Sequence, residues 1–324
     1  GSEMCIRDRT YTTAPNAFGT STFEIKVKDD GGTDNGGIDT SDAQTFTITV
    51  NTVADVPSIS TGITTNEDTQ STGLVITNND ARVTHFKITN IVNGTLYKND
   101  GSTAISNGHF ITEAEGNAGL KFTPGLNSIT GGSFGIQSSI ANNDSGLGGN
   151  VITANIAVNP VNDKPTFTAS NPPAVNEDAV AQSITNWITI FNPGPTHENS
   201  QVVSDYLIEN MSNPDLFAVT PDVDNSGTLT YTVAANTFGT STFEVKVKDD
   251  GGTANSGIDT SDALTFTLTV NTIADVPSVT NATTNEDTQS EAGLVITDNG
   301  DISVTHFKMT NIVGGTLYQS CLLY

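Results

Sequence analysis

Residues 22–50, TFEIKVKDDGGTDNGGIDTSDAQTFTITV, contain two segments in which apolar and polar side chains alternate. The apolar members are Phe23, Ile25 and Val27 in the first segment and Phe46, Ile48 and Val50 in the second. A period of two places these side chains on one face of a β-strand, so we predict two strands, each with one buried and one solvated face. The Asp-Asp-Gly-Gly run that follows the first strand is typical of a tight turn.

The same period of two recurs along the chain, in LTYTV (229–233), GLKFTP (119–124), SFGIQSSI (133–140) and NVITANIAV (150–158). Short residue runs that favour hairpin turns separate these segments, including Asn93-Gly94, Asn107-Gly108 and Asn225-Ser226-Gly227. No segment shows sustained helical spacing. Short strands in units of about 110 residues indicate an all-β chain of tandem two-sheet β-sandwiches.

Internal repetition sets the domain organisation. Residues 11–57 and 231–277 share 38 identities in 47 positions, and THFKITNIVNGTLY (84–97) returns as THFKMTNIVGGTLY (305–318). The chain therefore repeats about every 220 residues. Asn-Glu-Asp opens each unit, at 66–68, 176–178 and 285–287, and Val/Ile-x-Asp-x-Pro closes it, at 53–57, 161–165 and 273–277. We infer two alternating module types.

These motifs predict the following boundaries. Residues 10–57 form the C-terminal half of a type 2 module, 58–163 a complete type 1 module, 164–277 a complete type 2 module, and 278–318 the N-terminal half of a second type 1 module. The two halves belong to different types and cannot complete each other, so both are expected to expose apolar strands. Residues 1–9 and 319–324 match neither repeat and resemble translated sequencing-adapter sequence, which predicts non-native tails. Both cysteines, Cys5 and Cys321, fall there.

Composition favours cationic partners. The chain has 36 acidic and 12 basic residues and a formal charge of -24, which argues against binding to nucleic acid or anionic membranes. There is no apolar run of about 18 residues that would span a membrane and no signal-peptide pattern. Hydrophobic residues make up 35% and aromatic residues 6% of the chain, enough for several small cores.

The stretch TLTYTVAANTFGTSTFEVKVKDDGGTANSGIDTSDALTFTLTVNTIADVP (228–277) resembles the cadherin-like, immunoglobulin-like modules of large bacterial surface adhesins, including repeat-containing adhesins of the RTX type. THFKITNIVNGTLYKNDGSTAISNGHFITEAEGNAGLKFTP (84–124) is similar to the module type that often alternates with them. The resemblance covers residues 11–318 and implies calcium at the domain junctions. The chain lacks the Asp-Arg-Glu motif and the full Asp-x-Asn-Asp-Asn linker of animal cadherins, so their ion stoichiometry does not carry over.

The junction acids are the main metal candidates, because calcium takes six to eight oxygen ligands. We expect the acid that closes one sandwich to meet the pair that opens the next. The expected groupings are Asp55 with Glu67 and Asp68, Asp163 with Glu177 and Asp178, and Asp275 with Glu286 and Asp287. The acidic turns Asp29-Asp30 and Asp249-Asp250 are candidates to join these clusters. The alternative is a set of solvated acidic turns.

A weaker metal candidate is DVDNSG (222–227), which places Asp222, Asp224 and Ser226 at the alternate positions of a calcium loop. Val233 stands where such a loop has its bidentate glutamate. A structural hairpin turn is the competing interpretation.

Catalysis is not expected. No His-Glu-x-x-His or phosphate-binding glycine loop occurs, and GLGGN (146–150) is interpreted as a glycine loop. We therefore predict a non-enzymatic, extracellular spacer of a bacterial cell-surface adhesin, whose joints are stiffened by calcium and whose cell-surface or matrix ligands are bound elsewhere. The alternative is a glycan- or protein-binding module, for which the single tryptophan, Trp187, is the candidate platform; packing in the core is its competing role.

Overall fold

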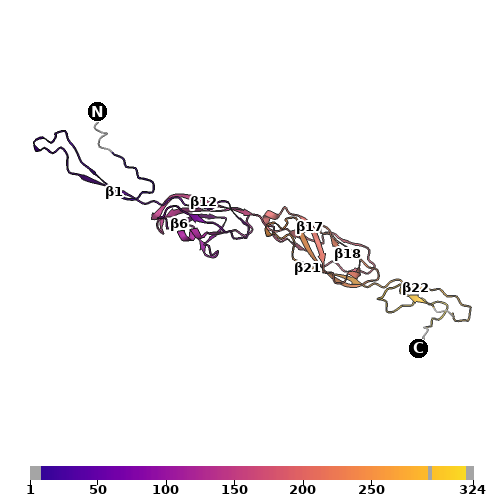
Figure 1. Cartoon of the computed structure of the whole chain (residues 1–324). Helices are drawn as coiled ribbons and strands as arrows, with labels where there is room; N and C mark the ends of the chain where they lie inside the picture. Colours follow the sequence, from indigo (N-terminus) through magenta and orange to yellow (C-terminus); the bar gives the residue numbers. More distant parts are fainter. Residues whose placement is uncertain (1–8, 291–293, 319–324) are drawn as a thin grey trace. The chain divides into compact units, whose positions relative to one another are not determined.

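The structure is a computed structural model that describes residues 9–290 and 294–318 (Figure 1). The chain divides into two compact units, Gly1–Pro160 and Val161–Tyr324, which are described separately. The expectations for Cys5, Cys321 and most of the two tails fall outside the described residues. No helix in the part of the chain that the structure describes is long and apolar enough to cross a membrane.

The first unit contains a sandwich built from two main sheets. The larger has the order β4-β12-β11-β6-β9 and the smaller the order β10-β7-β8, while β3 pairs with β5. The strands are β3 (Ser58–Ile59), β4 (Ile63–Asn66), β5 (Ile76–Thr77), β6 (His85–Val92), β7 (Gly94–Tyr97), β8 (Ala104–Ile105), β9 (Phe110–Thr112), β10 (Lys121–Pro124), β11 (Gly132–Ser139) and β12 (Leu147–Asn159).

The core of this sandwich consists of the inward-facing residues of both sheets. Phe86 and Ile88 on β6, Phe122 on β10 and Phe134 and Ile136 on β11 are all fully buried. These residues follow the period of two seen in the sequence, which confirms the predicted strand faces. The turn between β6 and β7 places Asn93 at φ 60, as its Asn-Gly pair predicts.

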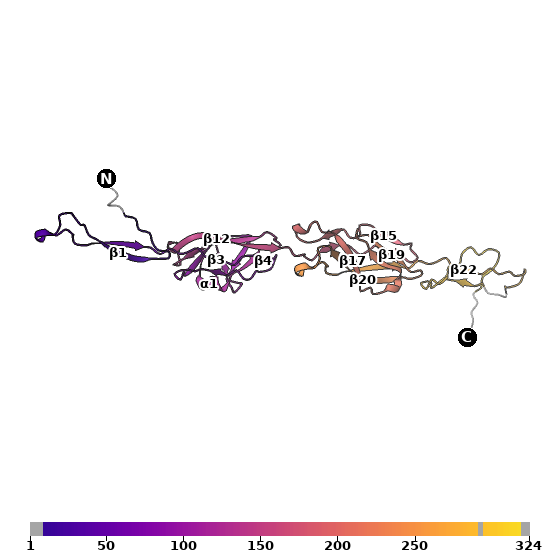
Figure 2. The same ribbon diagram turned by 45° about the horizontal axis from the view of Figure 1, so that its top comes forward.

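The second unit is a sandwich of the same class. Its main sheet has the order β14-β21-β20-β17 and the opposite sheet β15-β19-β18, and β13 pairs with β16 (Figure 2). The strands are β13 (Thr166–Thr168), β14 (Val175–Asn176), β15 (Gln182–Ile184), β16 (Ile190–Asn192), β17 (Val203–Glu209), β18 (Phe217–Val223), β19 (Leu229–Val233), β20 (Gly239–Asp249) and β21 (Leu264–Asn271).

Aromatic residues from all parts of the second unit meet in its core. The Trp187 ring lies 4.8 Å from the Phe266 ring and 6.2 Å from the Phe243 ring, measured between centroids. Trp187 is only 5% exposed, and its indole Nε1 donates a hydrogen bond of 2.7 Å to the carbonyl of Ser170. The core-packing interpretation of Trp187 is confirmed, and its ring is not exposed as a sugar platform.

The two copies of residues 22–50 differ in their surroundings. Among the described residues, β1 (Gly19–Ile25) of the first unit pairs only with β2 (Gln44–Val50), whereas the equivalent strands β20 and β21 lie inside a four-stranded sheet. Phe23 is 41% exposed and stacks on Phe46, while the equivalent Phe243 is 0% exposed. The predicted exposure of apolar residues in the first copy is confirmed.

The remaining elements are short. A small hairpin, β22 (Ser278–Val279) with β23 (Ile296–Thr297), lies in the segment after the second sandwich. One α-helix, α1 (Glu113–Ala118), was not expected from the sequence; Thr112 and Glu115 form a capping box at its start. The 3-10 turns are η2 (Asp34–Gly36), η3 (Asp144–Gly146), η4 (Thr196–Glu198), η5 (Pro214–Leu216) and η6 (Ala254–Ser256). The chain is thus an all-β protein of tandem sandwiches.

The interpretation of GLGGN as a glycine loop is wrong for two of its glycines, because Gly148 and Gly149 belong to β12. The segment Val53–Val56 crosses this strand so closely that a Cβ on Gly148 would lie 2.4 Å from both the amide nitrogen and the carbonyl oxygen of Ala54. Ala54 is 1% exposed. Glycine is required here for close backbone approach.

We expect Gly148→Ala to displace the Val53–Val56 segment from β12 and to destabilise the first unit by about 1–3 kcal/mol, the usual effect of overpacking. Urea unfolding followed by circular dichroism measures this change. Gly125→Ala is the control, because a Cβ there would meet only Ser128 at 3.7 Å. Equal stability of the two variants would contradict the close approach.

Candidate metal centre

The opening Asn-Glu-Asp turn of each complete sandwich lies beside the end of that sandwich's last strand. β4 pairs in parallel with β12, with Asn66 opposite Asn159, and β14 pairs in parallel with β21, with Asn176 opposite Asn271. Parallel strands end at the same edge of a sheet, so the opening turn and the exit of the chain emerge together. In the first unit the Glu67 amide donates to the Asn159 carbonyl at 3.0 Å.

This topology corrects the predicted grouping of the acids. The sequence analysis grouped Glu177 and Asp178 with Asp163, but the Glu177 carboxylate accepts a hydrogen bond of 2.9 Å from the amide of Ile273, in the exit segment of the same sandwich. The same topology places Glu67 and Asp68 beside the exit of β12 rather than with Asp55. The prediction was wrong because it placed the opening turn at the start of its own module. The parallel pairing of the opening strand with the last strand places this turn at the opposite end of the module, where the last strand ends.

The acids beside the exit of the second sandwich, Glu177, Asp178, Asp275 and Asp301, are called the exit cluster, and Glu177 contacts the exit segment directly. It is 3% exposed, and its amide donates to the Asn271 carbonyl at 2.9 Å. Oε1 accepts the Ile273 bond, while Oε2 is buried without a hydrogen-bond partner among the described residues. An ionised carboxylate held this way is costly to bury unless a cation or a proton compensates it.

Asp178, Asp275 and Asp301 add further negative charge to this exit cluster. Partial burial raises the pKa of Asp275, and the charges of Asp178 and Asp301 raise it further. The Asp275 amide donates to Oδ2 of Asp301 at 3.0 Å. Negative charges that raise the pKa of a neighbouring carboxyl, as at Asp275, mark a place where a divalent cation would be stabilising.

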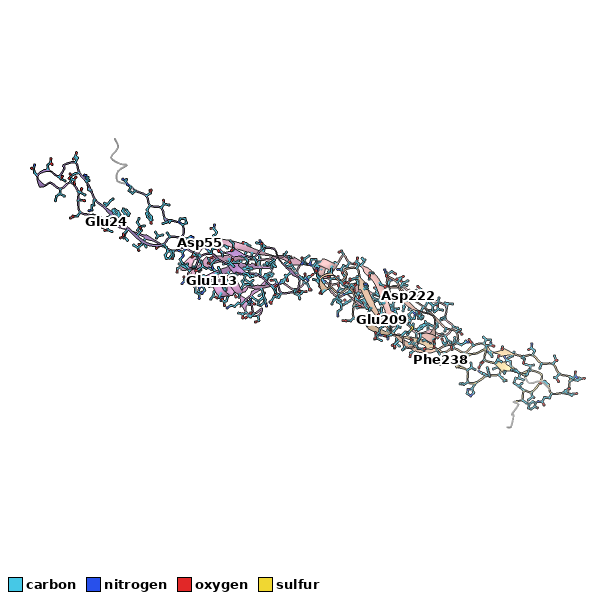
Figure 3. The ribbon with its side chains drawn as sticks, viewed as in Figure 1. Glu24, Asp55, Glu113, Glu209, Asp222 and Phe238 are labelled. Carbon is cyan, nitrogen blue, oxygen red and sulfur yellow. The ribbon has the colours of Figure 1, made fainter. Side chains whose placement is uncertain are left out.

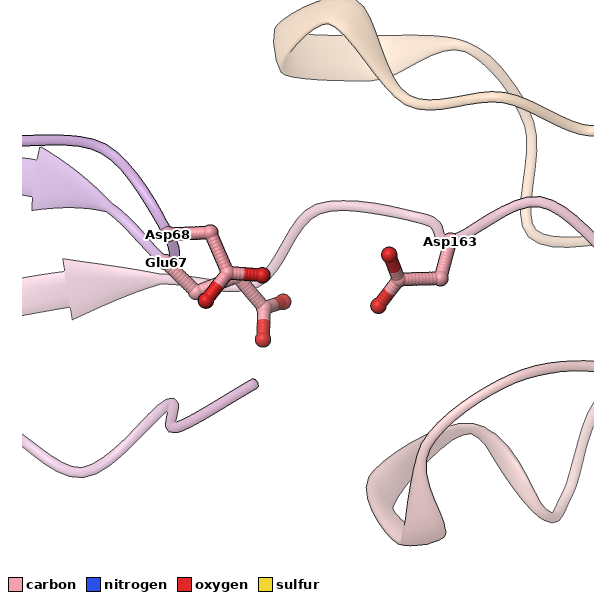
Figure 4. Close-up of side chains that lie close together, drawn as sticks. All are labelled: Glu67, Asp68 and Asp163. Atoms are coloured by element: carbon pink, nitrogen blue, oxygen red, sulfur yellow. The ribbon is translucent and has the colours of Figure 1, made fainter. Parts of the chain in front are cut away.

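Asp68 and Asp178 occupy equivalent positions and share a structural role. Both adopt positive φ, 54° and 59°, and each accepts a backbone hydrogen bond from a loop of its own sandwich, Asp68 from Asn127 and Asp178 from Asn236. Figure 4 shows Glu67 and Asp68 leaving one turn after β4, with Asp163 on the segment that follows β12. One oxygen of each aspartate is therefore committed to holding the turn.

A second acidic cluster lies at the start of the second sandwich. The Asp163 amide donates to Oε1 of Glu198 at 2.9 Å, and Asn162 Nδ2 donates to Oδ1 of Asp249 at 3.0 Å. Gln201 donates to the Asn162 side chain at 2.7 Å. The acidic turn after β20 therefore meets the linker through Asp249. Asp250 instead accepts a hydrogen bond from the Val202 amide.

Asp249 is 1% exposed, and its Oδ2 is buried without a hydrogen-bond partner among the described residues. Burial raises the pKa of this carboxyl, hydrogen bonds from Asn162 and Gly251 oppose the shift, and the charges of Asp259 and Asp250 add to it. The equivalent Asp29 is exposed and accepts a local hydrogen bond from the amide of Gly31. The buried environment of Asp249 therefore comes from the residues that surround it in the second sandwich.

The raised pKa gives a pH prediction. Because the folded pKa of Asp249 lies above the unfolded one, this group stabilises the fold below about pH 3.8, and the contribution is lost as pH rises through the folded pKa. At neutral pH without divalent cations, Asp249→Asn should therefore unfold at a higher temperature than the wild type, and the difference should shrink as the pH is lowered. Trp187 fluorescence during heating measures it. A destabilised variant in chelator would contradict the assignment.

The remaining candidates lie apart from these clusters. Asp222 lies on β18, and Asp55 is exposed (Figure 3). Asp224 accepts hydrogen bonds from both the amide and the hydroxyl of Ser226, which lowers its pKa and supports the structural-turn interpretation. Asp30, Glu286 and Asp287 are also exposed.

Three residues of the clusters were not singled out in the sequence: Asp301, its repeat equivalent Asp80, and Glu198. Asp80 and Asp301 occupy the same repeat position, so alignment of the two copies is the signal that identifies them. Glu198 lies in η4, in a part of the chain that has no second copy to compare.

No protein-family model and no curated protein matches the sequence. Among solved structures, the chain is similar to human protocadherin-24 EC1-2, with 12% identity over 66% of this chain and 98% of that one and a TM-score of 0.40. Mouse cadherin-23 EC22-24 gives 14% identity over 70% of each chain and a TM-score of 0.40. Drosophila N-cadherin EC1-4 gives 13% identity over 79% of this chain and 58% of that one, with a TM-score of 0.37.

Proposed function

We propose that this chain is a non-catalytic spacer of an extracellular adhesive protein of the bacterial cell surface, and that calcium bound at the exit of each sandwich stiffens its joints. The observation that carries the proposal is Glu177. This residue is only 3% exposed. Its Oε1 accepts a hydrogen bond from the Ile273 amide in the exit segment, and its Oε2 is buried without a hydrogen-bond partner among the described residues. A bound cation would satisfy that oxygen.

Calcium is the cation that these ligands favour. All the candidate donors at the exit of the second sandwich are oxygens, from Glu177, Asp178, Asp275 and Asp301. Calcium accepts six to eight oxygen ligands at 2.3–2.6 Å in flexible geometry, whereas zinc takes nitrogen or sulfur together with oxygen in a tetrahedron. The formal charge of -24 favours accumulation of cations around the chain.

The exit of the first sandwich carries the same parts. Glu67 is buried, its amide is bonded to the Asn159 carbonyl, and Asp68 is next to it. We propose that Glu67 and Asp68 supply ligands to an ion at this strand end, as Glu177 and Asp178 do at the exit of the second sandwich.

An ion at the exit of the second sandwich would link that sandwich to the segment that follows Pro277. It would contact the opening turn, the exit segment and, through Asp301, the following segment. Without the ion, the carboxylates repel one another and the exit segment retains only a few backbone bonds. A repeated module with such a joint gains length by duplication and rigidity by binding calcium, which is what a surface spacer requires.

Small-angle X-ray scattering of the 324-residue chain tests the spacer function. We expect the maximum dimension and the radius of gyration to increase when calcium replaces chelator, and the distribution of distances to narrow. Asp275→Asn should weaken this response, while Asp215→Asn, at an exposed carboxylate in η5, should leave it unchanged. Identical scattering curves with and without calcium would rule out the stiffening.

A further inference from the structure

The two copies of one joint differ in the side chain that follows a shared aspartate by two positions. THFKITNIVNGTLY and THFKMTNIVGGTLY align residue 84 with residue 305, and therefore Asp80 with Asp301 and Arg82 with Ser303. In the second copy the Asp301 carboxylate accepts a hydrogen bond from the amide of the linker acid Asp275. In the first copy the backbone of the linker acid Asp55 lies close enough to Asp80 to help lower its pKa. The backbone arrangement of the joint is thus repeated, while the side chain two residues after the aspartate changes from a cation to a hydroxyl.

Arg82 places a fixed positive charge on the first copy. Its Nε donates to Oδ1 of Asp80 at 2.8 Å, and one terminal nitrogen donates to Oδ2 at 3.0 Å. The Asp80 side chain is 3% exposed, and the guanidinium lies 4.7 Å from the centroid of the Phe18 ring. Both carboxylate oxygens are occupied by a planar bidentate donor, the strongest form of this contact.

Ser303 leaves the second copy without that charge. Its hydroxyl donates to Oδ1 of Asp301 at 2.6 Å and its amide donates to the same oxygen at 2.8 Å. Oδ2 of Asp301 holds the Asp275 amide. The hydroxyl supplies hydrogen bonds but does not neutralise the surrounding carboxylates, and the buried Glu177 carboxylate accepts a hydrogen bond from Ile273, two residues before Asp275.

We propose that residue 82/303 decides whether this joint takes up a divalent cation: Arg82 substitutes for the ion in the first copy, and Ser303 leaves the second copy to bind one. The inference rests on the proposed calcium-dependent joint. A guanidinium and a calcium ion compete for the same carboxylate oxygens, so a joint that holds the first binds the second weakly. Neighbouring joints of one chain would then respond differently to calcium.

Calcium titration by isothermal calorimetry of the whole chain tests this. Ser303→Arg is expected to weaken binding at the second joint about tenfold or more, while Ser303→Ala, which removes the hydroxyl without adding charge, should bind within about twofold of the wild type. Trp187 fluorescence in chelator checks that Ser303→Arg still folds. Equal calcium affinity of Ser303→Arg and the wild type would overturn the proposal. Equal losses of calcium affinity in Ser303→Arg and Ser303→Ala would overturn it as well.

The reverse change provides a second, independent test. Arg82→Ser should bind one more calcium ion than the wild type, because the Asp55 and Asp80 carboxylates are then no longer neutralised. An unchanged number of ions would overturn the proposal. A wild type that binds no calcium would instead contradict the proposed calcium-dependent joint. The two proposals therefore fail with different experimental results.

Discussion

Replacing Trp187 by alanine is expected to destabilise the second sandwich by about 3–5 kcal/mol, the usual range for removing a large buried aromatic side chain. The ring is 5% exposed and contacts both Phe243 and Phe266, which come from neighbouring strands of the main sheet. Its loss also leaves the Ser170 carbonyl without the indole donor. Urea unfolding followed by circular dichroism measures the effect.

Trp187→Phe is the matched control, since it keeps an aromatic ring and removes only the indole nitrogen and part of the volume. We expect it to destabilise the sandwich by less than half as much. A Trp187→Ala variant with wild-type stability would show that the side chain does not belong to the core and would reopen its assignment as an exposed binding platform.

Calcium in large excess is expected to raise the unfolding temperature of the second sandwich. A ligand at one hundred times its dissociation constant stabilises the folded state by about 2.7 kcal/mol, which corresponds to roughly 10 °C for a domain of this size. The chain contains a single tryptophan, so fluorescence of Trp187 reports this sandwich selectively.

Glu177→Gln should lose most of the calcium-induced rise, because glutamine keeps an acceptor for the Ile273 amide and removes the buried charge. In chelator the same variant should be at least as stable as the wild type, since the uncompensated charge is gone. Asp215→Asn serves as control and should show the full rise. If Glu177→Gln responds to calcium as strongly as the wild type, Glu177 is not a ligand.

The strands were predictable from sequence because each depends on a local pattern. The alternation through Phe86 and Ile88, or through Phe243 and Val245, identifies the buried face without knowledge of the partner strand. The turn at Asn93 likewise follows from its own residue type. The short helix α1 was missed, although the Thr112–Glu115 capping box was visible in the sequence.

The grouping of the acids was not predictable in the same way. The partner of Glu177 depends on β14 pairing in parallel with β21, whose partner residues lie 95 positions further along the chain, at Asn271 for Asn176. No local pattern encodes that pairing. The burial of Asp249 depends in turn on Asn162, which is 87 residues away. Sequence identified the right residue types, and topology decided which of them meet.

Isothermal calorimetry of calcium binding to the wild-type chain and to Glu177→Gln tests the central claim most directly. We expect the wild type to bind calcium and Glu177→Gln to bind at least one ion fewer, while Trp187 fluorescence shows an intact second sandwich. Absence of binding to the wild type, or identical binding by both proteins, would contradict a cation site at the exit of the sandwich.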